Sequence, residues 1–131
     1  TDYLAIVKKI LQKKLKGAKI TLDKKTRVSV AGCSIGYPDD YTSVKGKKVL
    51  GLQNISKDAL VYGSGISKNK NEFVVNGGRI MHIVGIGKDV VGARAQVYSE
   101  ISKVFIEGNN LHYRTDIGWR DVERKNMFNS D

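Results

Sequence analysis

The middle of the chain is a series of short apolar runs separated by glycine, asparagine, lysine and serine. The runs lie at residues 27–31, 48–52, 59–62, 73–75 and 79–85. Runs this short, bounded by turn-forming residues, are typical of β-strands rather than helices. Because turn-forming residues, and no helical pattern, link these runs, neighbouring strands pair most readily in the antiparallel sense. The pattern therefore predicts a mainly antiparallel sheet.

A strong turn signal joins the last two runs. Asn76, Gly77 and Gly78 lie between them. Asparagine and glycine tolerate the positive φ that a tight turn requires. We therefore expect residues 73–85 to form a β-hairpin.

The N-terminal segment has helical periodicity. Residues 4–15 carry apolar side chains at helical spacing, with lysines on the opposite side. We expect Thr1 or Asp2 to cap this helix and Gly17 to end it. The apolar face predicts packing against protein, including a domain outside this chain.

A second helix follows the strand region. Apolar residues recur at helical spacing over residues 90–105, and Asp89 is a suitable N-cap. Residues 111–119 leave room for one further strand and a loop. With helices placed before and after the strands, the predicted fold class is α+β, with a mainly antiparallel sheet, one long helix and a preceding N-terminal helix.

Positive charge is concentrated at the start of the chain. The formal net charge is +10 over 131 residues, and residues 1–25 hold eight lysines against two aspartates. This cluster is consistent with a binding surface for RNA or another polyanion. It is equally consistent with a solvated helix face, which we favour because the cluster lacks arginine and has Tyr3 as its only aromatic residue. A basic RNA-binding module is the alternative function.

Several classes of protein are not supported. No apolar run approaches the ~20 residues of a membrane span, and no secretory leader is visible. Cys33, the single cysteine, suits a reducing compartment, so a cytoplasmic protein is expected. One cysteine with His82 and His112 supplies neither the number nor the spacing of zinc ligands. No phosphate-binding loop, nucleophile motif or catalytic residue is identified.

Two short motifs could bind an anionic substrate. Gly77 and Gly78 leave backbone N–H groups open to close approach, and Arg79 directly follows them. The simpler interpretation is a turn followed by a surface arginine. Arg114 and Asp116 lie two positions apart and could form a structural ion pair without any chemistry.

Taken together in their order, five motifs carry a resemblance. They are Gly36-Tyr37-Pro38-x-Asp40-Tyr41, Asn76-Gly77-Gly78-Arg79, Ala93-x-Ala95 leading to Tyr98, Glu107-Gly108, and Tyr113-Arg114-x-Asp116-Ile117-Gly118-Trp119-Arg120. In this order and spacing they resemble the C-terminal region of the phosphoribosylamine–glycine ligase family, the glycinamide ribonucleotide synthetases. The resemblance covers about residues 27–125.

The resemblance implies an ATP-dependent carbon–nitrogen ligase of purine biosynthesis that joins glycine to phosphoribosylamine, with ATP and Mg²⁺ as cofactors. It assigns residues 1–25 to the terminal helix and linker of an ATP-grasp region, 26–126 to the C-terminal domain and 127–131 to a frayed tail. The nucleotide and metal ligands of the family lie mainly upstream, so this chain is expected to hold neither cofactor and to be inactive alone. Since the chain also lacks an initiator Met, we expect a piece of a larger polypeptide.

The resemblance also implies partners and a site. The expected partners are the ATP-grasp and N-terminal domains of the ligase, with phosphoribosylamine and glycine as substrates and neither membrane nor nucleic acid. In such ligases the C-terminal domain closes one side of the active site. The resulting hypothesis is that Gly77, Gly78 and Arg79 face the phosphoribosyl substrate, while Arg114 and Asp116 orient it or the loop from a second side.

The chain departs from the family pattern at two places. Asp39 stands where the family usually has glycine, and residues 63–66 replace a His-Ala-Gly-Thr-like stretch of which only Gly65 remains. No role of that histidine or threonine transfers to this chain. The departures leave open a domain that has kept the fold without the activity.

Overall fold

The computed structural model describes residues 1–128. Within this range the chain forms three α-helices and eight strands. In chain order they are α1 (Tyr3–Leu11), β1 (Thr26–Ser34), β2 (Lys48–Leu50), β3 (Leu60–Gly63), β4 (Ile66–Asn69), β5 (Glu72–Val75), β6 (Arg79–Gly87), α2 (Val90–Ile101), β7 (Phe105–Ile106), β8 (Leu111–His112) and α3 (Trp119–Phe128).

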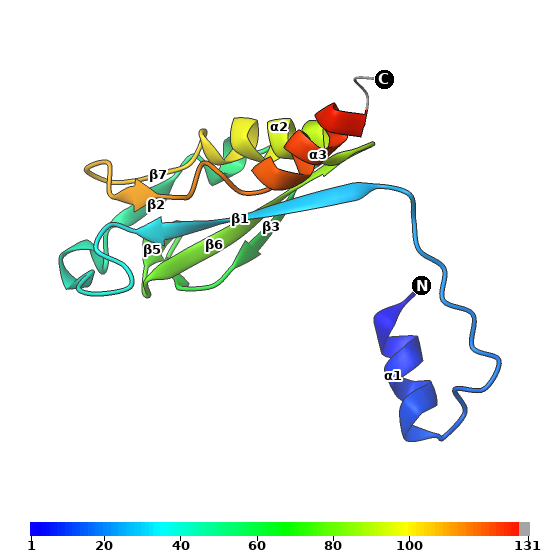
Figure 1. The fold of residues 1–131 in the computed structure, drawn as a ribbon. Helices are drawn as coiled ribbons and strands as arrows, with labels where there is room; N and C mark the ends of the chain where they lie inside the picture. Colours follow the sequence, from blue (N-terminus) through cyan, green and yellow to red (C-terminus); the bar gives the residue numbers. More distant parts are fainter. Residues whose placement is uncertain (129–131) are drawn as a thin grey trace.

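The strands form two four-stranded antiparallel sheets. Their strand orders are β3-β6-β1-β8 and β4-β5-β2-β7. Helix α2 packs on β6 and β1, and α3 lies beside α2 (Figure 1). One apolar core cluster joins α2 to residues of both sheets. The α+β class with antiparallel pairing is thus confirmed, with the strands divided between two sheets.

The connection at residues 76–78 is not a hairpin turn. Strand β5 pairs with β4 and β2, whereas β6 pairs with β1 and β3. The expected hairpin over residues 73–85 is therefore wrong, and the connection passes from one sheet to the other. The physical reason is the length of the available partner strands. Strand β6 pairs with residues 26–33 of β1, whereas β5 has only four residues and would offer a much shorter pairing.

Two elements carry no strong sequence signal. Strand β4 is mostly polar and takes its place by pairing with β5. Helix α3 begins at Trp119, directly after Gly118 with φ of +79°. Of the tail expected to fray, residues 127 and 128 belong to α3, and residues 129–131 lie outside the described residues.

Helix α1 stands apart from the sheets (Figure 1). Its expected cap is confirmed, because the Asp2 carboxylate accepts a hydrogen bond from the Leu4 N–H at 2.9 Å. The helix ends at Leu11 rather than at Gly17, and Lys13 then adopts a positive φ of 56°. No residue of α1 is buried, so packing does not extend the helix to the expected length.

Helix α2 lies unusually close to β6 because of two glycines. A Cβ at Gly85 would overlap the Ala93 carbonyl and lie 2.6 Å from the Val97 nitrogen, and one at Gly87 would overlap the Ala93 nitrogen. The expected cap is confirmed, since Asp89 Oδ1 accepts the Gly92 N–H at 2.9 Å. The helix is therefore held firmly against its sheet at its N-terminal half.

None of the helices in residues 1–128 is both long enough and apolar enough to cross a bilayer.

Candidate functional site

A pocket of about 320 Å³ lies beside β1, between the loop after that strand and the segment after β8. It is lined by Val30, Ala31, Cys33, Tyr37, Pro38, Arg79, His112, Tyr113, Arg114 and Ile117. Its walls are mostly apolar, with polar groups supplied by two arginines, a histidine and two tyrosines. Such a combination suits a small ligand with one anionic group.

Arg79 is the first residue of β6 and supplies a positive charge to this pocket. Among residues 1–128 it forms no ion pair. Burial raises the pKa of the neighbouring Cys33 thiol, and the Arg79 charge offsets part of that rise. A buried thiol with a raised pKa is a poor nucleophile, which agrees with a structural role for Cys33.

Gly77 and Gly78 are fixed by Ser34, a buried residue at the end of β1. The Ser34 N–H donates to the Gly78 carbonyl at 2.8 Å, and its hydroxyl donates to the Gly77 carbonyl at 3.1 Å. Within the described residues, neither glycine N–H donates to a backbone carbonyl. Ser34 therefore satisfies both glycine carbonyls, whereas the two glycine N–H groups have no backbone acceptor among the described residues.

Gly78 is required by a close contact, and Gly77 packs tightly against Gly65. A Cβ at Gly78 would overlap the Tyr37 ring, which lines the pocket. Gly77 does not line the pocket; its Cα would lie 2.7 Å from a Cβ at Gly65. Gly65, the residue of segment 63–66 that matches the family pattern, thus leaves room for the connection at residues 76–78 to lie against it.

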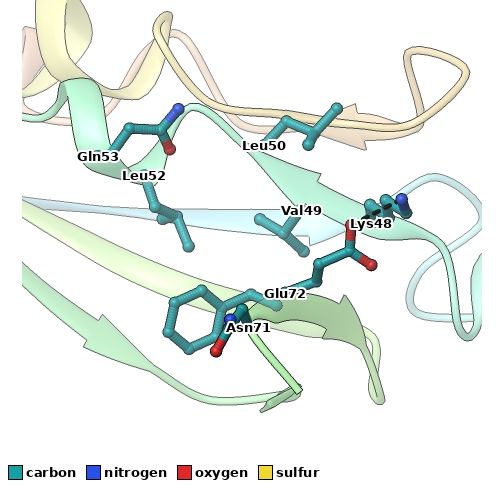
Figure 2. A pocket seen from close by; sticks show the side chains of 8 residues that line it. Lys48, Val49, Leu50, Leu52, Gln53, Asn71 and Glu72 are labelled. Carbon is teal, nitrogen blue, oxygen red and sulfur yellow. Dashed lines mark ion pairs between the residues drawn. The ribbon is translucent and has the colours of Figure 1, made fainter. Parts of the chain in front are cut away.

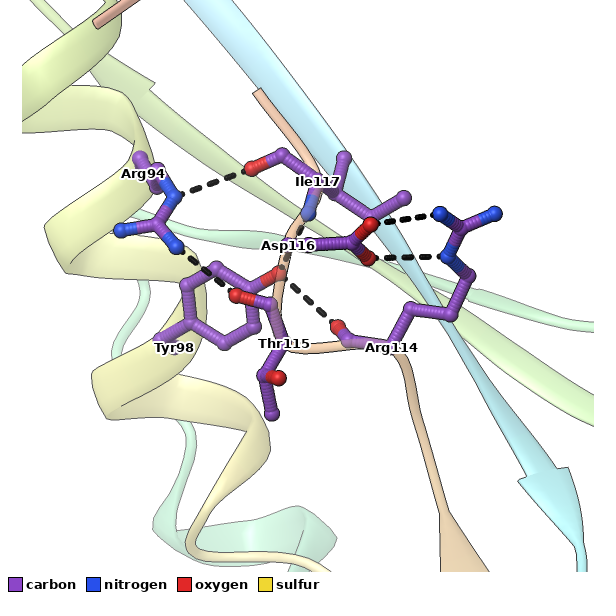
Figure 3. Close-up of polar contacts among 6 residues, drawn as sticks. All are labelled: Arg94, Tyr98, Arg114, Thr115, Asp116 and Ile117. Atoms are coloured by element: carbon purple, nitrogen blue, oxygen red, sulfur yellow. Dashed lines mark hydrogen bonds and ion pairs between the residues drawn. The ribbon is translucent and has the colours of Figure 1, made fainter. Parts of the chain in front are cut away.

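Arg114 and Asp116 form a two-point ion pair after β8 (Figure 3). Arg114 Nε lies 2.8 Å from Asp116 Oδ1, and Nη2 lies 2.5 Å from Oδ2. The hydrogen bonds from Arg114 lower the pKa of Asp116, and the pair raises the pKa of Arg114. The predicted structural ion pair is therefore present, and Arg114 keeps its Nη1 group for another partner.

The structure thus brings three of the five predicted residues to one place. Arg79 and Arg114 line the pocket, and Gly78 adjoins it through Tyr37. Asp116 reaches it through its pair with Arg114, whereas Gly77 lies behind Gly78. Their action on a substrate stays a prediction.

Tyr37 and His112 are pocket residues to which the sequence pattern gave no role. Tyr37 had a sequence signal, because it precedes Pro38 in the first of the five family motifs. Its ring lies 6.3 Å from that of Tyr41. His112 ends the two-residue β8 and is paired with Cys33 in β1, a long-range register that no local pattern reveals.

A second hollow of about 450 Å³ lies on the other sheet (Figure 2). Its apolar lining residues are Val49, Leu50, Leu52 and Phe73. Its two charged residues neutralise each other, because Lys48 Nζ and Glu72 Oε1 lie 2.7 Å apart. The hollow therefore offers no net charge to an anionic substrate.

The acidic, histidine and cysteine side chains of residues 1–128 do not form a site that suits Mg²⁺. Residues 1–128 contain no group of three or more histidine, cysteine, aspartate or glutamate side chains that could hold a metal ion. Asp116, which follows the pocket residue Arg114 by two positions, is occupied by that arginine.

An α+β domain of two antiparallel sheets, with an arginine-bearing pocket at the sheet that contains β6, β1 and β8, is the class that fold and site define. Residues 27–120 match the family described as phosphoribosylglycinamide synthetase, C domain. The chain belongs to this family, as the ordered motifs indicated.

Similar proteins agree with this assignment. The phosphoribosylamine–glycine ligase of Caldanaerobacter subterraneus subsp. tengcongensis is 39% identical over 117 residues, covering 89% of this chain and 27% of that protein. The ligase of Pseudomonas aeruginosa is 33% identical, covering 95% and 28%. A bifunctional purine biosynthetic protein of Dictyostelium discoideum is 32% identical, covering 95% of this chain and 16% of its own length.

A solved structure has the same fold. The crystal structure of the phosphoribosylamine–glycine ligase of Thermotoga maritima superposes with a TM-score of 0.64 at 30% identity. The match covers 86% of this chain and 27% of that one. This chain therefore spans roughly a quarter of the length of such ligases.

Proposed function

We propose that this chain is the C-terminal domain of a phosphoribosylamine–glycine ligase, in which it closes and positions the active site. The observation that carries the proposal is the family match over residues 27–120, which includes every residue of the pocket. Relatives of this name are 39% and 33% identical along most of the chain. The proposed reaction joins glycine to phosphoribosylamine with conversion of ATP to ADP and phosphate, in purine biosynthesis.

The pocket's proposed ligand is the phosphoribosyl end of phosphoribosylamine. The Arg79 guanidinium lines the pocket and has no ion-pair partner among residues 1–128, and the N–H group of the adjoining Gly78 supplies a second donor, with Gly77 behind it. Donors on consecutive residues suit a phosphate. Arg114 offers Nη1 from the second side, while Asp116 limits the excess of positive charge. Substrate held in this way loses freedom before it reacts, so the domain contributes by positioning.

The proposed partners are the ATP-grasp and N-terminal domains of the same ligase. Residues 1–25 would be the terminal helix and linker of the ATP-grasp region, and residues 26–126 the C-terminal domain. Most large apolar side chains of residues 1–25 are exposed, so no other part of the described chain covers them. Those more than two-fifths exposed are Tyr3, Leu4, Ile10, Leu11, Leu15, Ile20 and Leu22.

ATP and Mg²⁺ are assigned to the parts of the ligase outside this chain. Residues 1–128 contain no group of side chains that fits Mg²⁺. The chain alone is expected to be inactive. The cytoplasm is the proposed location, a reducing compartment that suits the unpaired Cys33.

Steady-state kinetics of a full-length ligase carrying this domain test the proposal. Replacing Arg79→Ala should raise the KM for phosphoribosylamine about tenfold or lower turnover, because a charge-assisted contact is lost. Arg124→Ala is the matched control: this arginine lies on α3, exposed and outside the pocket. Unchanged kinetics of the Arg79 variant would overturn the assigned site.

A further inference from the structure

The segment that carries Arg114 and Asp116 has little regular structure of its own. It runs from the two-residue β8 to the start of α3, so neither a sheet nor a helix satisfies its backbone groups. Two side chains of α2 do so instead (Figure 3). These are Arg94 and Tyr98.

Arg94 and Tyr98 together bind four backbone groups of this segment. Arg94 Nε donates to the Ile117 carbonyl at 3.0 Å, and Nη2 donates to the Thr115 carbonyl at 2.7 Å. The Tyr98 hydroxyl donates to the Arg114 carbonyl at 2.8 Å and accepts the Ile117 N–H at 3.0 Å. Residues 114, 115 and 117 are thereby bonded from one side.

The two clamping side chains form one rigid unit. They are four residues apart and share a face of α2. The Arg94 guanidinium carbon lies 4.9 Å from the centre of the Tyr98 ring, a cation–π distance. Gly85 and Gly87 hold the same helix tightly against β6, so the unit has a fixed base.

The clamp acts on the backbone, and the side chains it positions point elsewhere. In Figure 3 the Arg114 guanidinium lies on the far side of the segment from α2, together with Asp116. Arg114 lines the pocket, whereas Arg94 and Tyr98 do not. A shift of the backbone at residues 114–117 would therefore move the pocket's second arginine.

We propose that Arg94 and Tyr98 are positioning residues for the pocket: they hold residues 114–117 so that Arg114 and Asp116 meet the substrate from a fixed direction. The identity of that substrate rests on the proposed function; the clamp itself rests on the contacts in this chain. Without the bonds to the backbone of residues 114–117, the Arg114 side chain would sample more orientations. Fixing this backbone removes part of that freedom before the substrate binds.

Amide hydrogen exchange in this chain tests the clamp. Tyr98→Phe removes the hydroxyl but keeps the ring. Arg94→Lys keeps the charge but loses the planar guanidinium that donates to the carbonyls of Thr115 and Ile117 at the same time. In both variants, exchange over residues 114–118 should become about five- to tenfold faster, the factor expected for lost hydrogen bonds. Exchange in β6 should not change. Tyr62→Phe, on the edge strand β3 with 57% exposure, is the control.

Kinetics of the full-length ligase test the positioning role. Both variants should raise the KM for phosphoribosylamine severalfold while the KM for glycine stays unchanged, a separation that general loss of stability does not produce. Unchanged exchange would overturn the clamp; faster exchange with unchanged KM values would overturn the positioning role. If Arg79→Ala also leaves the kinetics unchanged, the assigned substrate site fails instead, and exchange alone decides whether the clamp exists.

Discussion

The Glu100 carboxylate accepts a hydrogen bond from the Ser56 N–H at 2.8 Å. Glu100 is only 5% exposed, so this carboxylate is buried as well as hydrogen-bonded. Lys103 Nζ also lies 2.8 Å from this carboxylate, which is thereby paired in addition to being hydrogen-bonded. These contacts tie the loop before β3 to the C-terminal half of α2. The hydrogen bond from Lys103, and then that from Ser56, lowers the pKa of Glu100.

The Glu100 carboxylate makes the free energy of unfolding depend on pH in the acidic range. Because the folded pKa lies below the unfolded value, the contribution of Glu100 is present at neutral pH and is lost as pH falls through the acidic range. Glu100→Gln should lower the stability at pH 7 by about 1 kcal/mol, roughly 4 °C in Tm. The difference from the parent should shrink towards pH 3. Thermal unfolding followed by circular dichroism at several pH values measures it.

The matched control for that experiment is Glu123→Gln, on the exposed face of α3. It should leave the pH profile unchanged. A constant difference between the Glu100 variant and the parent at every pH would contradict the assigned role of the charge.

The contact between α2 and β6 depends on a glycine. Gly85→Ala would drive a methyl group into the backbone at Ala93, where no flexible side chain can yield, so we expect a loss of roughly 3 kcal/mol or more. Gly92→Ala is the control, since a Cβ there makes only ordinary contacts, with Asp89 Oδ1 at 3.6 Å and with the Gly87 Cα at 3.9 Å. It should be neutral or stabilising by up to about 1 kcal/mol. Urea unfolding measures both; equal stabilities would contradict the close packing.

Local signals predicted the elements better than their pairing. The caps at Asp2 and Asp89 are short-range hydrogen bonds, so neighbouring residues suffice to predict them. Residues 76–78 carry a valid turn signal, yet their strands join different sheets. Strand partners depend on the whole set of available edges, here the long β1, which no window of a few residues contains.

The site was predictable as a set of residues and not as an arrangement. Arg79 and Arg114 lie 35 positions apart in the sequence and were named from motifs, while the pocket that they share depends on the pairing of β1 with both β6 and β8. Tyr98 was named only as a helix and motif residue. Its hydroxyl contacts segment 114–117 across the fold, a relation that helical periodicity does not contain.

The Arg114–Asp116 pair separates a structural role from a functional one. Their side chains are 73% and 45% exposed, and exposed pairs contribute little to stability. Asp116→Asn should therefore leave Tm nearly unchanged while raising the KM for phosphoribosylamine about three- to tenfold in the full-length ligase. The similarly exposed pair of Asp121 and Arg124 supplies the control, Asp121→Asn. An unchanged KM for Asp116→Asn would leave the pair a purely structural contact.

The N-terminal segment tests the polyanion alternative. Removing residues 1–22 deletes six lysines and one aspartate but keeps the Asp23–Arg27 pair. Since no residue of α1 is buried, the truncated chain should retain the Tm of the parent within about 2 °C. The whole chain should bind single-stranded RNA weakly, with affinity falling steeply as salt rises, and truncation should remove most of this binding. Filter binding at two salt concentrations measures it, and tight binding that persists at high salt would favour a basic RNA-binding module over the ligase domain.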